Sequence, residues 1–120
     1  MAKAPRVAGI CYIKVDGEQL ELKGGMEAPL FALQRETVMG SAGVAGYKET
    51  PLTPFVKGTF IFMPGFPLSK LSGTDMTVTA EFANGKVYTL SNAYVVGETS
   101  AKAEEGEVEL HFEGKKGIWQ

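Results

Sequence analysis

Two side chains in the sequence have chemistry suited to catalysis or metal binding: the single histidine and the single cysteine. His111 lies between Glu109 and Glu113, and a histidine beside carboxylates is a candidate general base. No second catalytic group accompanies it, so the favoured interpretation is a strand residue making polar contacts. Cys11 lies in an apolar segment with no neighbouring histidine to activate it, which favours a small buried hydrophobic residue over a nucleophile.

Metal and phosphate sites are also not indicated. One histidine and one cysteine cannot supply the usual nitrogen and sulfur ligands. The acidic run over residues 104–109 lacks the Asp/Asn–Gly loop of calcium motifs. The glycines of Gly40–Lys48 match neither phosphate-binding nor dinucleotide-binding spacing, and Lys48 does not directly follow a glycine. The sequence therefore predicts no cofactor, no metal and no enzymatic activity.

Composition predicts one domain spanning residues 1–120. The net charge is −2 and no basic cluster exceeds Lys115-Lys116, which argues against a nucleic-acid reader. No apolar run approaches the roughly 20 residues of a membrane-spanning helix. The opening residues lack the apolar core of a signal peptide, and a single cysteine fits a reducing compartment.

The elements that would position these groups are mainly strands, because apolar residues recur with a period of two. Alternating segments at 6–16 and 18–23 flank Asp16-Gly17, which predicts a hairpin. Alternating segments at 75–82 and 86–90 flank Asn84-Gly85, which predicts a second hairpin. The alternation over residues 106–113 predicts a last strand.

Two other stretches and the two ends of the chain depart from this pattern. Thr59–Met63 is continuously apolar, so we expect a strand that is covered on both faces or lies against a neighbouring subunit. Pro67–Ser72 has the spacing of one or two helical turns. The ends, Met1–Pro5 and Gly114–Gln120, are expected to fray. The sequence thus predicts a mainly β, antiparallel domain with one short helix.

A long segment, Gly40–Pro54, combines spaced glycines with two prolines. Ordering such a backbone costs extra entropy, and prolines are excluded from central strands, so we expect a loop. Loops of about 15 residues are uncommon in compact domains and are usually functional or disordered. Two interpretations stay open: a mobile surface loop, or a contact arm that orders against a partner with Tyr47 as its anchor.

Several segments, which follow in the same order along the chain, resemble the tail tube proteins of Mu-like contractile-tailed bacteriophages, whereas Thr59–Ser72 departs from that pattern. The runs that carry the resemblance are Ala8-Gly9 to Asp16-Gly17, Glu36 and Val38 into Gly40–Pro51, Pro54-Phe55, Val78–Tyr88, Asn92–Glu98, Ala103–Gly106 and Phe112–Gly114.

The resemblance implies an antiparallel β-sandwich or barrel with a short flanking helix, and a structural role in a virion tail assembled in the host cytoplasm. It implies six copies in a ring, with rings stacked helically through the long loop. The inter-ring contact residues would be Gly40, Gly43, Gly46, Tyr47, Lys48, Glu49 and Pro51. The implied partners are other copies of the chain, the tail sheath, baseplate or initiator and terminator proteins, and a tape-measure protein in the lumen.

The resemblance also implies that DNA passes through the tube without specific binding. An acidic lumen would repel DNA phosphates, so that the polymer slides. The candidate lumen acids are Glu81, Glu107, Glu109 and Glu113, some of which would instead pair with lysines of the next subunit. The plainer interpretation of these acids is a solvated face that blunts a sheet edge.

Other hypotheses belong to different classes. A tailocin or secretion-type machine would use a tube subunit of the same fold. A monomeric β-sandwich binding module would have an ordered loop and remain a monomer at high concentration. A small hydrolase would lose its activity on His111→Ala, whereas a tube subunit would keep assembling.

Overall fold

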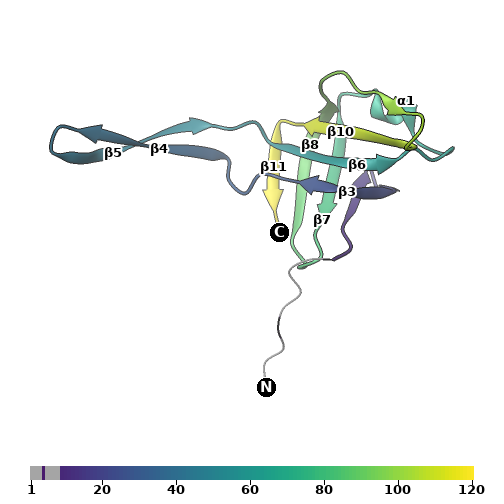
Figure 1. The fold of residues 1–120 in the computed structure, drawn as a ribbon, viewed down its shortest axis with the longest axis horizontal. Helices are drawn as coiled ribbons and strands as arrows, with labels where there is room; N and C mark the ends of the chain where they lie inside the picture. The colour runs from purple at the N-terminus through teal and green to yellow at the C-terminus, as the bar shows by residue number, and fades with distance from the viewer. Residues whose placement is uncertain (1–3, 5–8) are drawn as a thin grey trace.

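The computed structural model describes residue 4 and residues 9–120. These residues form strands and one helix of a single turn, arranged as a folded sheet with a long two-stranded projection (Figure 1). The elements are β1 (Tyr12–Val15), β2 (Glu18–Leu20), β3 (Leu22–Glu27), β4 (Leu33–Gly40), β5 (Gly43–Pro51), β6 (Phe55–Ile61), α1 (Leu68–Leu71), β7 (Met76–Glu81), β8 (Val87–Val95), β9 (Ala101–Lys102), β10 (Glu107–Glu113) and β11 (Lys116–Trp119).

The body consists of two antiparallel sheets that share β8. The first sheet has the order β2-β1-β7-β8, with β11 on the other side of β8. The second has the order β8-β10-β6-β3, with β9 added to β10. On the opposite side the chain passes directly from β2 to β3 through Glu21, whose carbonyl accepts a hydrogen bond from the Ile61 amide at 2.9 Å. The sheet is thereby folded into a sandwich, which confirms the predicted mainly β class.

Both turn signals in the sequence produce the expected hairpins. Asp16 and Gly17 have φ of 50° and 84°, the left-handed values that a tight two-residue turn requires, and Val15 pairs with Glu18 across it. Gly85 has φ of 90° and follows Asn84, whose side chain accepts a hydrogen bond from the Lys86 amide. The predicted last strand is β10, and the predicted helical turn is α1.

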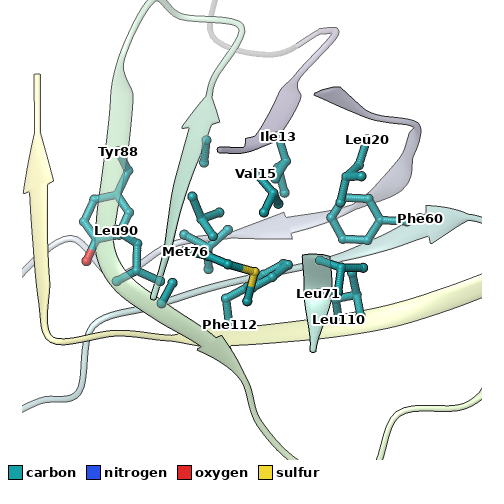
Figure 2. Packing of buried hydrophobic residues seen from close by; sticks show 14 of the residues in the cluster. Ile13, Val15, Leu20, Phe60, Leu71, Met76, Tyr88, Leu90, Leu110 and Phe112 are labelled. Atoms are coloured by element: carbon teal, nitrogen blue, oxygen red, sulfur yellow. The ribbon is translucent and has the colours of Figure 1, made fainter. Parts of the chain in front are cut away.

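The core lies between the two sheets and follows the predicted alternation (Figure 2). Ile13, Val15 and Leu90 enter it from the first sheet, and Phe60 and Phe112 from the second, all with no exposed surface. Cys11 is a correction: it is only half-buried and lies outside this cluster, in the segment just before β1.

The expected fraying of Gly114–Gln120 is also wrong. β11 pairs with β8 from Lys116 opposite Ser91 to Trp119 opposite Tyr88. The Trp119 indole N–H donates a hydrogen bond to the Pro29 carbonyl at 2.8 Å, which ties the end of the chain to a distant segment. The glycines at 114 and 117 argue against a strand in the sequence, because glycine lowers strand propensity. In the structure they allow this segment to approach β8 closely, where a Cβ would overlap residues of that strand. Of the other predicted frayed end, Met1–Pro5, only Ala4 is among the described residues.

The predicted loop Gly40–Pro54 is largely strand. β4 and β5 pair along their whole length as a separate hairpin, with Ser41 and Ala42 at its tip, and the hairpin projects from the body. We call Leu33–Pro51 the arm. Its prolines do not interrupt it, because Pro51 is the last residue of β5 and Pro54 lies beyond it. The glycines did not indicate a hairpin, because β4 and β5 are held together by pairing between the strands and not by buried side chains.

We predict that Gly114→Ala destabilises the fold. A Cβ at this buried position would lie 2.7 Å from the Ser91 carbonyl oxygen and 2.8 Å from Leu90 Cγ. Relieving such overlap costs about 1–3 kcal/mol of unfolding free energy, which chemical denaturation would measure. Gly65→Ala is the control, because no atom lies within 4 Å of its Cβ position. Equal stability of the two variants would contradict a packed carboxyl terminus.

Candidate functional site

The arm carries every residue predicted to contact another ring. Gly40, Gly43, Gly46, Tyr47, Lys48, Glu49 and Pro51 all lie on β4 or β5. Almost the whole arm is exposed, and the Tyr47 side chain is 65% exposed although it is a large aromatic residue. Isolated two-stranded hairpins are only marginally stable in water. The arm is therefore suited to burial against another surface.

Charges on the arm are satisfied within the arm. Arg35 Nε donates to Glu49 Oε2 at 3.0 Å, and Lys48 Nζ lies 3.5 Å from Glu36 Oε2. The Arg35 guanidinium also lies 5.5 Å from the centre of the Tyr47 ring. Exposed ion pairs contribute at most about 1 kcal/mol each, so they do little for stability. Their larger effect is to leave apolar side chains as the unpartnered groups, namely Leu33, Val38, Met39, Val44 and Tyr47.

An apolar hollow of about 540 Å³ lies at the base of the arm. Leu30 and Phe31 are 71% and 73% exposed at this hollow. Trp119 lines it, with its ring centre 5.3 Å from that of Phe82, and its hydrogen bond to Pro29 fixes the segment that carries Phe31. The remaining lining residues are Ala28, Asn84 and Lys86.

A second apolar surface lies at the far end of β6. Ile61, Phe62, Met63 and Leu68 are each at least 36% exposed there. β6 runs from the arm toward α1, so this surface and the arm occupy opposite ends of the body (Figure 1). We expected Thr59–Met63 to be covered on both faces or to lie against a neighbouring subunit. Cover on both faces within the chain is wrong, because β6 ends at Ile61 and Phe60 is the buried residue of this segment. Cover by a neighbouring subunit stays a prediction.

The four candidate lumen acids do not form one surface. Glu107, Glu109 and Glu113 alternate along the outer face of β10 in the second sheet. Glu81 is on β7 in the first sheet, where it lies 3.5 Å from Lys14. Sequence spacing did not reveal this separation, because sheet membership is decided by pairing between distant segments.

The outer face of β10 is polar and mixed in charge. Glu107 forms a hydrogen-bonded ion pair with Lys23 and lies 3.8 Å from Lys102, which is also 3.6 Å from Glu109. The hydrogen bond from Lys23 lowers the pKa of Glu107, and the same hydrogen bond raises the pKa of Lys23. The pair spans β6, which lies between β3 and β10, and the Glu107 side chain, only 13% exposed, is the best-shielded acid of the face.

His111 lies on the same face without a catalytic partner. Its Nε2 has no hydrogen-bond partner among the described residues and is 3.9 Å from a Glu113 oxygen, and its ring packs against Phe55 at 5.4 Å between centres. In the described part of the chain, no three histidine, cysteine or acidic side chains are grouped to hold a metal ion. Nor is any helix of residues 4 and 9–120 long and apolar enough to span a membrane.

A β-sandwich with an internally neutralised arm and exposed apolar surfaces at both ends defines a structural protein that associates with other chains. The chain belongs to the phage tail tube protein family, whose model matches residues 4–119, and this confirms the resemblance in the sequence. Its role is structural in the tail tube and not enzymatic.

Solved structures support the same fold. The chain is similar to the sheath/tube terminator of an extracellular contractile injection system, PVC, with a TM-score of 0.69, 13% identity, and coverage of 100% of this chain and 99% of that one. A chain of the PVC sheath–tube complex gives 0.62, 14% identity and coverage of 98% and 91%. The tube-terminating cap of the anti-feeding prophage gives 0.63, 10% identity and coverage of 100% and 92%. No curated protein sequence matches the chain.

Sequence reasoning missed the hollow at the base of the arm. Its residues come from four separate segments, near 28–31, 82, 84–86 and 119, so no pattern within a single segment indicates the hollow. The available signal was the adjacent pair Leu30-Phe31 outside any alternating strand, together with the only tryptophan near the end of the chain.

We predict that Glu107→Gln lowers the free energy of unfolding at neutral pH. The variant's free energy of unfolding is also expected to fall less as the pH is lowered. The folded-state pKa of Glu107 lies below the ordinary value of 4.5, so its contribution is present above that pH and disappears as the pH falls through the lowered pKa. The Lys23 contribution, with a pKa raised above 10.5, is lost only in strong base.

Thermal unfolding between pH 7 and pH 2 would measure this effect. Glu109→Gln is the matched control, since it makes the same charge change on the same strand at a side chain that is 70% exposed. If the melting temperatures of the two variants depend on pH in the same way, the Lys23–Glu107 pair contributes no more to stability than the exposed Glu109 does.

Proposed function

We propose that the chain is a tail tube subunit that assembles into stacked hexameric rings and forms the hollow conduit for DNA ejection within a contractile tail. The observation that carries this proposal is the arm: a projecting, charge-neutral hairpin with exposed apolar side chains in a member of the tail tube family. Exposed apolar surfaces of this kind mark sites of association with other proteins.

The positions of the apolar surfaces support head-to-tail association. The arm is at one end of the body and the surface around Phe62 and Met63 is at the other, so no two copies need present the same face to each other. Contacts between different faces generate closed rings when the rotation completes a circle, and helical stacks when a translation is added. Both arrangements are needed in a tube.

The outer face of the second sheet supports a polar lumen. Lys23, Lys57 and Lys102 lie on this face, and each is within 4 Å of a glutamate of the same chain. Phosphates bind proteins chiefly through available lysine and arginine side chains. Lysines already paired with Glu107, Glu27 and Glu109 leave DNA no row of free cations to hold it.

The further partners proposed are the tail sheath, the tail terminator, a baseplate or initiator protein, and a tape-measure protein that occupies the lumen before DNA. We place the finished tube in the virion and its assembly in the host cytoplasm. The similarity to chains of a sheath–tube complex and of tube terminators supports the sheath and terminator contacts.

A second candidate is a tube subunit of a tailocin or secretion-type injection machine. The three solved structures described above come from contractile injection systems and an anti-feeding prophage, which favours this candidate over a monomeric binding module. Electron microscopy of particles from the producing cells separates the two candidates: a DNA-filled head on the tube supports the phage, and headless particles support the injection machine.

We predict that replacing Leu33–Pro51 by Asn-Gly abolishes tube formation and leaves a folded monomer. The Leu52 amide donates to the Ala32 carbonyl at 2.9 Å, so the two ends of the arm are already adjacent and a tight turn can join them. Negative-stain electron microscopy over a wide concentration range, with tube fragments added as seeds, would compare this variant with the unmodified chain.

Six-fold rings or hollow tubes from the unmodified chain are the expected result. An unchanged melting temperature of the arm-less variant would show that its body folds alone. Normal tubes from the arm-less variant would contradict the role of the arm, and a seeded unmodified chain that stays monomeric would contradict the tube function itself.

A further inference from the structure

The two faces of the arm differ in chemistry, and contacts between side chains identify them. Arg35 contacts both Glu49 and Tyr47, so these three side chains share one face, which we call the Tyr47 face. Glu36 contacts Lys48 on the other face, which we call the Lys48 face. Strand residues alternate between faces, so Leu33 and Met39 join Arg35, and Val38 joins Glu36.

A one-residue bulge decides where Val44 points. Val38 pairs with Gly46 and Met39 with Val44, so Ala45 is an extra residue in β5. Val44 and Tyr47 are three residues apart and would face opposite ways in a regular strand. With the bulge, Val44 lies opposite Met39 on the Tyr47 face. A Cβ at Gly40 would lie 3.6 Å from the Ala45 Cβ, which places Ala45 on the Lys48 face with Val38.

The bulge therefore collects the exposed apolar side chains on one face. Met39, Val44 and Tyr47 are 66%, 71% and 65% exposed on the Tyr47 face, whereas Val38, 43% exposed, is the large apolar side chain of the Lys48 face. The charged members of the Tyr47 face, Arg35 and Glu49, are paired with each other. Both faces are thus electrically neutral, but the exposed apolar side chains gather on the Tyr47 face and the Lys48 face is mainly polar.

We propose that the Tyr47 face is the docking surface of the arm and is buried against a second copy of this chain, while the Lys48 face stays in contact with water. This inference rests on the proposed function and specifies which side of the arm makes the contact. A second copy is the favoured occupant because every copy presents apolar surfaces outside its own arm, namely the hollow around Phe31 and Trp119 and the surface around Phe62 and Met63. A nucleic acid is disfavoured, because Arg35 is already paired.

The test uses the same substitution on the two faces. Val44→Asp and Val38→Asp each add one negative charge to an exposed valine of the arm. We expect Val44→Asp to raise the concentration needed for tube assembly at least about tenfold, and Val38→Asp to change it by less than about twofold. Sedimentation and negative-stain microscopy measure the assembly. Equal effects of the two variants, or a larger effect of Val38→Asp, would overturn the proposal.

Thiol labelling provides a second measurement on assembled tubes. In a Cys11→Ser background, Val44→Cys is expected to be protected from maleimide in tubes and labelled in monomers, whereas Val38→Cys is labelled in both. Equal labelling of the two thiols in tubes would overturn the proposal while leaving the tube function intact. If the unmodified chain forms no tube even when seeded, the proposed function fails and this inference fails with it.

Discussion

The pairing of β8 with strands of both sheets is the constraint on which the rest of the structure depends. Its first part pairs with β7 and β11, and Tyr94 and Val95 at its end pair with β10. Because one strand belongs to both sheets, the sheets must fold over a common core, where Leu90 and Phe112 are fully buried. The body is closed by strands outside the arm, so Leu33–Pro51 is free to project from it.

The arm is nevertheless fixed to the body at its base. β11 lies against β8, and the Trp119 indole reaches across to the Pro29 carbonyl. Trp119 also packs on Tyr88, with 4.9 Å between ring centres, so the anchor rests on a buried side chain. The last strand therefore positions the segment that leads into the arm and that carries Phe31 at the hollow.

The sequence predicted those elements whose signals are local. Asp16-Gly17 and Asn84-Gly85 each sit between alternating segments, and both produce the expected hairpins. The arm and β11 were missed because their glycines and prolines indicate loops when a segment is considered alone. The separation of Glu81 from Glu107 and the assembly of the hollow depend on which distant strands pair, and that information is not present in the spacing of any one segment.

The arm also presents two open strand edges, because within residues 9–120 β4 and β5 pair only with each other. Open edges of this kind can recruit further strands and grow into fibres. The extra residue Ala45 interrupts the hydrogen-bonding row of β5, and Pro51 at its end has no amide hydrogen to offer. The irregularity that orients Val44 thus also protects the free chain from uncontrolled edge-to-edge aggregation, so that its apolar face can stay exposed until a partner covers it.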